Sequence, residues 1–333
     1  MNSLLDNIQL LGSGRMSAVL ALVAIISFGL ILADSSQTAA QASELGGVDR
    51  GAILDAEGGV LANVAPGSNG RGMLAQRFPS LAASLGYQDS VGRWHGLEGS
   101  YNAALSGDGS RSSFTGFLNH LMGRQIVGDN VRTTIEPGVQ EVAQRALRGR
   151  KGAVVAIDPR TGAVLALAST PCRPDKPCLD RATSFLSPPG SCFKIVTLSA
   201  ALDSGEFTLN SLFSGTDAFG PNPNFDNSLY PSNVTRSDLT VLTLAQALAF
   251  SDNFVFAHIG ATLGAKVLSS YAHRFYLDRR IPFALPVARS TIFADHANPT
   301  LAELETSSFG ATADQVTPLQ MALIVSTVAN HGV

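Results

Sequence analysis

An apolar segment that directly follows a proline–glycine turn places the strongest constraint on how this chain folds. The segment opens with the residues PPGSCFK (188–194) and continues as an apolar run to Leu202. Two prolines and a glycine end an extended segment and permit a sharp turn. A helix that is apolar on nearly all sides is a buried one. We therefore predict a central, buried helix that opens at Ser191 and stops at Gly205.

Ser191 and Lys194 stand three residues apart at the start of this helix, so both side chains lie on one face, one turn apart. A buried lysine is costly unless it has a partner or a lowered pKa. A serine hydroxyl is a poor nucleophile unless a nearby base takes its proton. A lysine with a lowered pKa can be the base that the serine needs, and the serine hydroxyl can be the hydrogen-bond partner that the buried lysine needs. Alone the pair is a weak signal, because such a serine can simply cap the helix and such a lysine can extend to solvent.

The first residues of the chain predict a membrane anchor. Residues 17–33 are almost entirely apolar and approach the length needed to cross a bilayer, with Arg15 just before them. We expect an uncleaved signal-anchor, with residues 1–16 in the cytoplasm and the bulk of the chain outside the cell membrane. A cleaved signal peptide is the alternative, with AQA at 40–42 as a small-x-small site. Residues 34–48 are small and polar, which is typical of a flexible stalk.

Charge and cysteine usage exclude some functions. The net charge is −3 and the chain has no runs of lysine or arginine, which argues against nucleic-acid binding. Cys172 and Cys178 bracket a short proline-containing loop and could form a disulfide outside the cytoplasm. Cys192 is expected to be a small packed side chain rather than a nucleophile. The six histidines are scattered without ligand spacing, so neither a metal site nor a cofactor is predicted.

Residues 49–130 are predicted to form a small, irregular, non-catalytic module. The residues RGAILD (50–55) begin an extended segment that turns at the glycine pair 58–59 and returns, which indicates a hairpin. A glycine- and serine-rich stretch follows, with a short helical piece around residues 97–105. No catalytic pattern appears in this module.

Residues 131–333 are predicted to form the main domain, of α/β (α+β) type, with helices around an antiparallel sheet. A strand at 131–135 leads to a helix from Pro137 to about Arg148. Residues 152–168 form an apolar hairpin whose strands are expected to be covered on both faces. Further helices are expected over residues 242–250, from Phe254 onward, and from Pro318 after a Thr317 cap.

A second polar motif supports the first. Sixty residues after Ser191 the chain reads Ser251-Asp252-Asn253, at the end of the helix predicted over 242–250. A Ser-x-x-Lys pair followed by Ser-Asp-Asn forms the first two parts of a three-part signature. The serine hydroxyl can relay the proton of a leaving group, and the amide can hold a substrate carbonyl.

With these motifs the chain resembles the class B penicillin-binding proteins, the membrane-anchored D,D-transpeptidases of bacterial cell-wall synthesis. The RGAILD segment is similar to the family's first hairpin after the anchor. The residues TTI (133–135) and the hairpin 152–168 resemble the opening of its transpeptidase domain, and DRAT (180–183) resembles the approach to its nucleophile. The short module around residues 87–109 is most similar to that of the small actinobacterial members.

The resemblance implies a penicillin-binding transpeptidase fold and a role for each motif residue. Ser191 would be the acylated nucleophile, Lys194 its general base, Ser251 a proton relay, and Asn253 the ligand of the substrate amide. The Ser191 backbone N–H would supply one oxyanion donor at a helix N-terminus.

The same resemblance implies substrates and partners. The serine would be acylated by a peptidoglycan stem peptide ending in D-Ala-D-Ala, and the acyl group would pass to an amine on a second strand. β-Lactam antibiotics mimic the first step and stall there. A membrane glycan polymerase and other proteins of cell division or elongation would be partners.

The third part of the signature, Lys-Thr/Ser-Gly, does not occur in the sequence. None of the lysines is followed by Thr-Gly or Ser-Gly, and Arg160-Thr161-Gly162 precedes Ser191 in a hairpin turn. In the family this element lies on a strand after the helix at Thr317. We therefore expect a truncated chain that lacks the C-terminal strands and is acylated slowly, because one oxyanion donor is worth roughly 10²–10³ in rate. A non-catalytic scaffold, a β-lactam-binding sensor and a serine β-lactamase are the alternatives.

Overall fold

The computed structural model describes residues 50–63, 78–107, 128–172, 178–214, 241–293, 298–311 and 314–332. The chain divides into two compact units, residues 1–184 with 282–287 and residues 185–281 with 288–333. The predicted anchor (17–33) and stalk (34–48) lie outside the described residues. Among the helices that are described, none is both long and apolar enough to cross a membrane.

The first unit contains a small three-stranded sheet with the order β2-β1-β3. Strand β1 (Ile53–Leu54) pairs antiparallel with β2 (Val60–Ala62) and parallel with β3 (Val131–Arg132). At the β1–β2 turn, one carboxylate oxygen of Asp55 accepts hydrogen bonds from the N–H groups of Glu57 (2.9 Å) and Gly59 (2.8 Å). Gly58 has a φ of 93°, a conformation that glycine adopts easily. The predicted hairpin is confirmed.

Short helices pack against this sheet: η1 (Pro79–Leu81), α4 (Ala82–Leu85), α5 (Gly96–Ser100) and α6 (Asn102–Leu105). The Arg50 guanidinium holds two of them to the start of β1. It donates to the Glu98 carboxylate (2.9 Å from Nε) and to Asn102 Oδ1 (2.8 Å), and it lies 4.3 Å from the centre of the Trp94 ring. The helical piece predicted around residues 97–105 is therefore present as two short helices.

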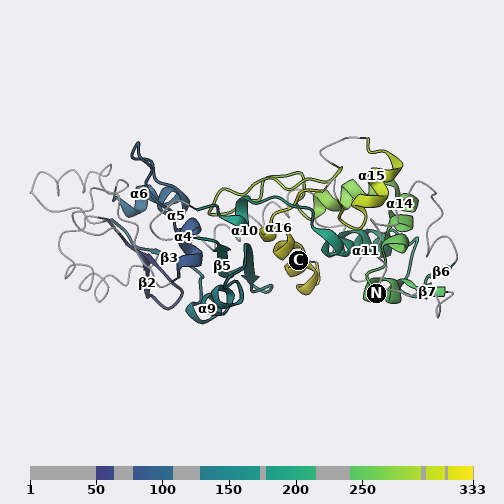
Figure 1. Cartoon of the computed structure of the whole chain (residues 1–333), viewed down its shortest axis with the longest axis horizontal. Coiled ribbons are helices and arrows are strands. Elements are labelled where there is room, and N and C mark those ends of the chain that lie inside the picture. Colours follow the sequence, from purple (N-terminus) through teal and green to yellow (C-terminus); the bar gives the residue numbers. More distant parts are fainter. Residues whose placement is uncertain are drawn as a thin grey trace, which may run out of the picture. The chain divides into compact units, whose positions relative to one another are not determined.

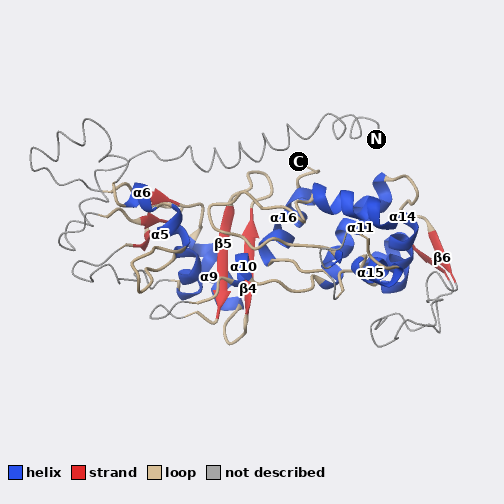
Figure 2. Ribbon diagram, turned by 90° about the horizontal axis from the view of Figure 1, so that it is seen from above, coloured by secondary structure: helices blue, strands red, loops and turns tan. Residues whose placement is uncertain are grey.

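The apolar hairpin consists of β4 (Gly152–Ile157) and β5 (Val164–Thr170), which pair antiparallel (Figure 2). Alternate residues supply its two faces. One face packs against the helix α9 (Pro137–Ala146), and its members are Val154, Ala156, Ala166 and Ala168. Val155, Ile157 and Leu167 join the larger core of the first unit, which also contains Ala182 of α10 (Arg181–Ser184). Both faces are covered, as predicted.

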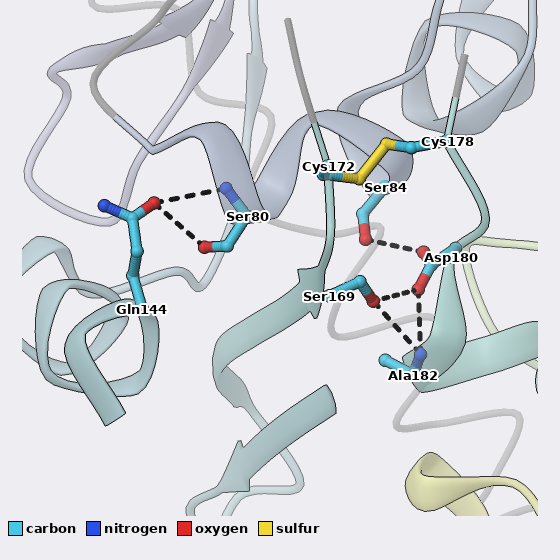
Figure 3. Close-up of a disulfide and its surroundings, with 8 residues drawn as sticks. All are labelled: Ser80, Ser84, Gln144, Ser169, Cys172, Cys178, Asp180 and Ala182. Atoms are coloured by element: carbon cyan, nitrogen blue, oxygen red, sulfur yellow. Dashed lines mark hydrogen bonds between the residues drawn. A yellow bond between two sulfur atoms is a disulfide. The ribbon is translucent and has the colours of Figure 1, made fainter. Parts of the chain in front are cut away.

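A disulfide joins Cys172 and Cys178 at the end of β5 (Figure 3), which confirms the pairing that their spacing allows. Asp180 follows two residues later and connects three elements. Its carboxylate accepts from the Ser84 hydroxyl (2.6 Å) of α4 and the Ser169 hydroxyl (3.1 Å) of β5. It also accepts from the Ala182 N–H (3.1 Å) in the first turn of α10. The disulfide therefore closes the loop that leads into this polar junction.

The second unit is built around α11 (Lys194–Asp203), which begins directly after the 3₁₀ turn η2 (Gly190–Phe193). Val196, Ala200 and Ala201 of α11 are fully buried, and the helix packs against α14 and α16 (Figure 1). The predicted central helix is confirmed, although its α-helical part begins at Lys194 and Ser191 lies in the preceding 3₁₀ turn. Gly205 follows its end with a φ of 76°. The other elements are β6 (Leu212–Ser214), β7 (Val241–Thr243), α13 (Leu244–Ala249), α14 (Asn253–Arg274), α15 (Leu301–Ser307) and α16 (Pro318–Ala329).

Side-chain caps fix where these helices begin. The Thr317 hydroxyl accepts from the Gln320 N–H (3.2 Å) ahead of Pro318, as predicted. Asp252 caps α14, which Gly264 breaks into two helical segments by adopting φ 78° and ψ 160°. Thr300 caps α15 and forms a capping box with Glu303. Sequence reasoning did not predict this helix, although a threonine followed three residues later by a glutamate is the usual signal of a helix start.

Candidate active site

Ser191 lies in the η2 turn, where its side chain is exposed to solvent. Residues 308–310, which are far away in sequence, fix the backbone of this turn and of the helix after it. The Gly190 N–H donates to the Gly310 carbonyl oxygen (2.8 Å), and the Thr197 hydroxyl donates to the Ser308 carbonyl oxygen (2.7 Å). Because Ser191 occupies the first turn of a helix, its own N–H belongs to the set that has no partner within the helix. The serine is thus accessible while its backbone is fixed.

Lys194 is the first residue of α11 and is fully buried. Its Nζ donates to the Ser191 hydroxyl oxygen (2.9 Å), the Ser251 hydroxyl oxygen (3.1 Å) and the Ser251 carbonyl oxygen (3.1 Å). It also donates to Asn253 Oδ1 (2.5 Å). All four residues singled out in the sequence, Ser191, Lys194, Ser251 and Asn253, therefore meet around one nitrogen atom.

Burial lowers the pKa of Lys194 to about 8, and the negative charge of Asp252 opposes this shift. The apolar side of the site consists of aromatic rings. The Phe256 and Phe309 ring centres lie 5.6 Å and 5.8 Å from Nζ. Since an amine near its pKa is partly neutral, Lys194 can accept a proton from Ser191 at mildly alkaline pH without a large energetic cost.

Ser251 and Asn253 are placed by the junction between α13 and α14. The N–H groups of Ser251 and Asp252 donate back to the Leu248 (3.0 Å) and Ala247 (2.8 Å) carbonyl oxygens. Ser251 adopts a φ of 57°, which is uncommon for a serine. Asn253 then begins α14. The unusual turn at Ser251 aims both its hydroxyl and its carbonyl oxygen at Lys194.

Cys192 lies beside Ser191 in the η2 turn. Cys192 was expected to be packed, and that prediction is wrong: its thiol is exposed and free. In the η2 turn residues 191 and 192 face solvent, while Phe193 fills the core position and is fully buried.

Arg160-Thr161-Gly162, the triplet in the sequence that comes nearest to the missing third motif, lies in the β4–β5 turn of the first unit. There Arg160 pairs with Asp158 (3.1 Å). Across the described ranges no three histidine, cysteine or acidic residues gather as a metal site would require.

Residues that sequence reasoning did not assign also shape the site. Asp252 was noted only as the middle of a tripeptide, although an aspartate ahead of an apolar helix is a common cap. The rings of Phe256 and Phe309 and the close approach of Gly310 to Gly190 come from segments far apart in the chain. No local pattern marks them.

Comparison with known proteins decides the family. The model of the penicillin-binding protein transpeptidase domain matches residues 152–333, a range that includes all four site residues. The chain belongs to this family. Its α/β fold is the penicillin-binding transpeptidase fold, and the family predicted from the motifs is confirmed.

The most similar relatives include mycobacterial transpeptidases. The chain is 31% identical over 320 residues to the peptidoglycan D,D-transpeptidase PbpA of Mycolicibacterium smegmatis, covering 83% of this chain and 62% of the relative. It is 32% identical over 266 residues to PbpA of Mycobacterium tuberculosis, covering 71% and 53%. The chain therefore spans about half to three-fifths of the length of these curated relatives.

Comparison with solved structures leads to the same family. The imipenem acyl-enzyme complex of penicillin-binding protein A from M. tuberculosis matches with a TM-score of 0.72 and 30% identity, over 84% of this chain and 71% of that one. The penicillin G acyl-enzyme complex of the same protein matches with a TM-score of 0.71 and 29% identity, over 85% and 71%. Both structures show this one relative as a β-lactam acyl-enzyme.

Proposed function

We propose that this chain carries the acylation site of a peptidoglycan D,D-transpeptidase that is acylated by β-lactam antibiotics. Ser191 is the nucleophile, Lys194 its general base, Ser251 a proton relay and Asn253 the ligand of the substrate amide. The observation that carries the proposal is the 2.9 Å contact between Lys194 Nζ and Ser191 Oγ, made by a buried lysine whose pKa is lowered to about 8. The β-lactam adducts of the M. tuberculosis relative support the same chemistry.

In the first step Ser191 Oγ attacks the carbonyl carbon between the two terminal D-alanines of a stem peptide. Lys194 Nζ takes the hydroxyl proton as the new ester bond forms. The Ser191 N–H, in the first turn of its helix, can donate to the oxygen that becomes negative. The exposed serine beside the buried amine suits this step, because the substrate must reach one and water must not solvate the other.

In the second half of the step the C–N bond breaks and D-alanine leaves as an amine. Ser251 Oγ, which lies 3.1 Å from Lys194 Nζ, is positioned to pass the proton to that nitrogen. Asn253 Oδ1 accepts from Lys194 Nζ, which leaves the side-chain N–H₂ group to donate to the backbone amide of the stem peptide. An amine of a second strand then attacks the ester and releases Ser191.

The domain organisation and location are proposed on the same basis. We assign residues 131–333 to the transpeptidase domain and 49–130 to a small non-catalytic module, with residues 17–33 as a single-pass anchor in the cell membrane. The Cys172–Cys178 disulfide supports an extracytoplasmic location, because such bonds persist in oxidising compartments. A membrane glycan polymerase and other division or elongation proteins are the proposed partners, and nucleic acid is not.

The test is covalent labelling of the full chain, in detergent, by a fluorescent penicillin, with the adduct located by mass spectrometry. We expect an ester on Ser191. The rate should rise with pH and level off above about 8, since only the neutral form of Lys194 accepts the proton.

Two variants serve as controls. Ser191→Ala should form no adduct, and Lys194→Met should fold while losing most of the labelling. A folded chain with no Ser191 adduct at saturating penicillin would overturn the proposal and favour the scaffold alternative.

A further inference from the structure

Residues 308–310, directly after α15, run along the η2 turn and the helix that follows it. The Thr197 hydroxyl of α11 donates to the Ser308 carbonyl oxygen (2.7 Å), and the Gly190 N–H of η2 donates to the Gly310 carbonyl oxygen (2.8 Å). Positions 197 and 190 are about two helical turns apart and so share one face. The segment therefore follows that face in the direction opposite to α11.

Phe309, the middle residue of the segment, packs beside the base. Lys194 lies on the same helical face, between the two positions that the segment holds. The Phe309 ring centre lies 5.8 Å from Lys194 Nζ, and the Phe256 ring centre of α14 lies 5.6 Å from it. Within the described part of the chain, these are the two rings that face the amine. Phe309 is 4% exposed, and Phe256 and Lys194 are fully buried.

The backbone on both sides of Phe309 is fixed. The Ser308 hydroxyl donates to the Leu304 carbonyl oxygen (2.6 Å) of α15. It also fills the space beside Gly260 of α14, where a Cβ atom would lie 1.7 Å from the Ser308 hydroxyl oxygen. With Ser308 held between two helices and Gly310 hydrogen-bonded to η2, the Phe309 ring has a defined place beside the amine.

We propose that Phe309 is a positioning residue for acylation, whose ring closes the apolar wall beside Lys194, excludes water from the amine and keeps Nζ directed at Ser191. Residues 308–310 thus place both the turn of the nucleophile and one wall of its base. Burial is the main cause that lowers the pKa of Lys194 to about 8, and Phe309 supplies part of that burial. The role rests on the proposed function, whereas the exclusion of water from one amine can be measured without it.

Two substitutions open this wall to different degrees. Phe309→Ala removes the ring, and Phe309→Leu leaves a smaller apolar side chain. The space that opens borders a polar amine, so water can enter and solvate the charged form. Loss of the attraction between ring and charge acts in the opposite direction. It is the weaker effect, because 5.8 Å is close to the outer limit of about 6 Å for such a contact.

Phe213 provides the matched control. It is also 4% exposed and belongs to the same apolar cluster as Phe309. Its ring packs against Phe207 and His258, with ring centres 5.9 Å and 6.0 Å apart. Phe213→Ala and Phe213→Leu therefore remove the same atoms from the same cluster, beside other partners.

The charges around the amine are the same in all four variants. Asp252, which caps α14, favours the charged form of Lys194. The Cys192 thiol of η2 is exposed to solvent, and neither residues 308–310 nor α16 contain an ionisable side chain. A shift in the titration of Lys194 at position 309 alone therefore reports the hydration of the amine.

The measurement is that titration in the full chain, prepared in detergent with lysine labelled by carbon-13 at the ε position. The Lys194 signal is assigned by its loss in Lys194→Met. We expect a midpoint near 8 in the wild type. It should rise by about one pH unit in Phe309→Ala and by less in Phe309→Leu, and it should stay in place in both Phe213 variants. A rise of one unit lowers the neutral amine at pH 7, and the rate of Ser191 labelling with it, about tenfold.

A merely structural role for Phe309 would give a different result, because the alanine variants at 309 and 213 should lose similar stability. An unchanged Lys194 midpoint in folded Phe309→Ala, or an equal rise in Phe213→Ala, would overturn the inference. If the alanine variants do not fold, equal midpoints in Phe309→Leu and Phe213→Leu overturn it instead. The chemical shift is read whether or not the serine is acylated, so failure of the proposed function would appear separately, as a missing Ser191 adduct in the wild type.

Discussion

Lys194 and Asp314 are both ionisable side chains buried in the second unit, and burial disfavours the charged form of each. For Lys194 the result is a lowered pKa for an amine that four oxygen atoms contact. Asp314 accepts a hydrogen bond from the Phe293 N–H (3.2 Å). Burial nevertheless raises the pKa of Asp314 to about 7, and the charge of Asp278 adds to the rise, while the nearby Ser307 side chain and the Phe293 N–H oppose it.

This shift predicts that Asp314 destabilises the fold as pH rises. An aspartate in the unfolded chain has a pKa of 3.8, so between pH 4 and 7 the folded chain binds a proton that the unfolded chain releases. The stabilisation from that proton is complete below pH 4 and is lost as pH rises to about 7. Asp314→Asn carries no such charge. Relative to wild type it should therefore gain about 2–3 kcal/mol at most between pH 5 and pH 8.

Urea unfolding of both chains at several pH values between 5 and 8 measures this difference. Glu206→Gln, which changes an exposed charge, should shift stability by the same small amount at every pH. If the gap between Asp314→Asn and wild type stays constant over this range, Asp314 is already charged in the folded chain at pH 5 and burial does not raise its pKa as proposed.

Among the secondary-structure elements, the η2 turn that carries Ser191 depends on a glycine more than a hundred residues away. Gly310 has a φ of 80°, and a Cβ atom there would lie 2.1 Å from the Gly190 carbonyl oxygen. The two backbones therefore touch, and no side chain fits between them. Gly205, at the end of α11, has a similar φ of 76° but no atom within 4 Å of where its Cβ would be.

These two glycines form a matched pair for a prediction. Gly205→Ala should cost about 1 kcal/mol, the strain of a left-handed conformation alone. Gly310→Ala should cost roughly 3 kcal/mol or more, because the η2 turn must also move. Chemical denaturation gives both values, and labelling of Ser191 by the fluorescent penicillin reports whether the site survives. Equal costs at the two sites would mean that the Gly190 turn yields to the added methyl group.

The elements that sequence reasoning predicted are those encoded by neighbouring residues. The proline–glycine turn and apolar run predicted α11, the Asp158–Gly162 turn predicted the β4–β5 hairpin, and Thr317-Pro318 predicted the start of α16. The motifs also predicted which side chains meet at Lys194. Exposure of Cys192 was not predictable, because the 3₁₀ turn rotates it away from the core that Phe193 fills. The support of Gly190 by Gly310 depends on tertiary packing that no local pattern contains.

At the scale of the whole molecule, the two units divide the stabilising features between them. The Arg50–Glu98 pair, the apolar hairpin and the Cys172–Cys178 disulfide belong to the first unit. The side chains and carbonyl that contact Lys194 all belong to the second. A change confined to one set should therefore leave the local hydrogen bonds of the other in place.

The disulfide provides the test of that division. It closes a loop with a sequence separation of six residues, for which the chain-entropy argument gives about 2 kcal/mol. The double variant Cys172→Ser/Cys178→Ser should lose about that much stability, and hydrogen exchange should rise in β5 and α10, since Asp180 joins them two residues after the bridge. The double variant and its reference chain both carry Cys192→Ser, so that the exposed Cys192 thiol cannot form a disulfide with another cysteine. Exchange in α11 and the rate of Ser191 labelling should not change. Faster exchange in α11 would show that the site depends on the first unit for its order, because none of the groups that contact Lys194 lies within it.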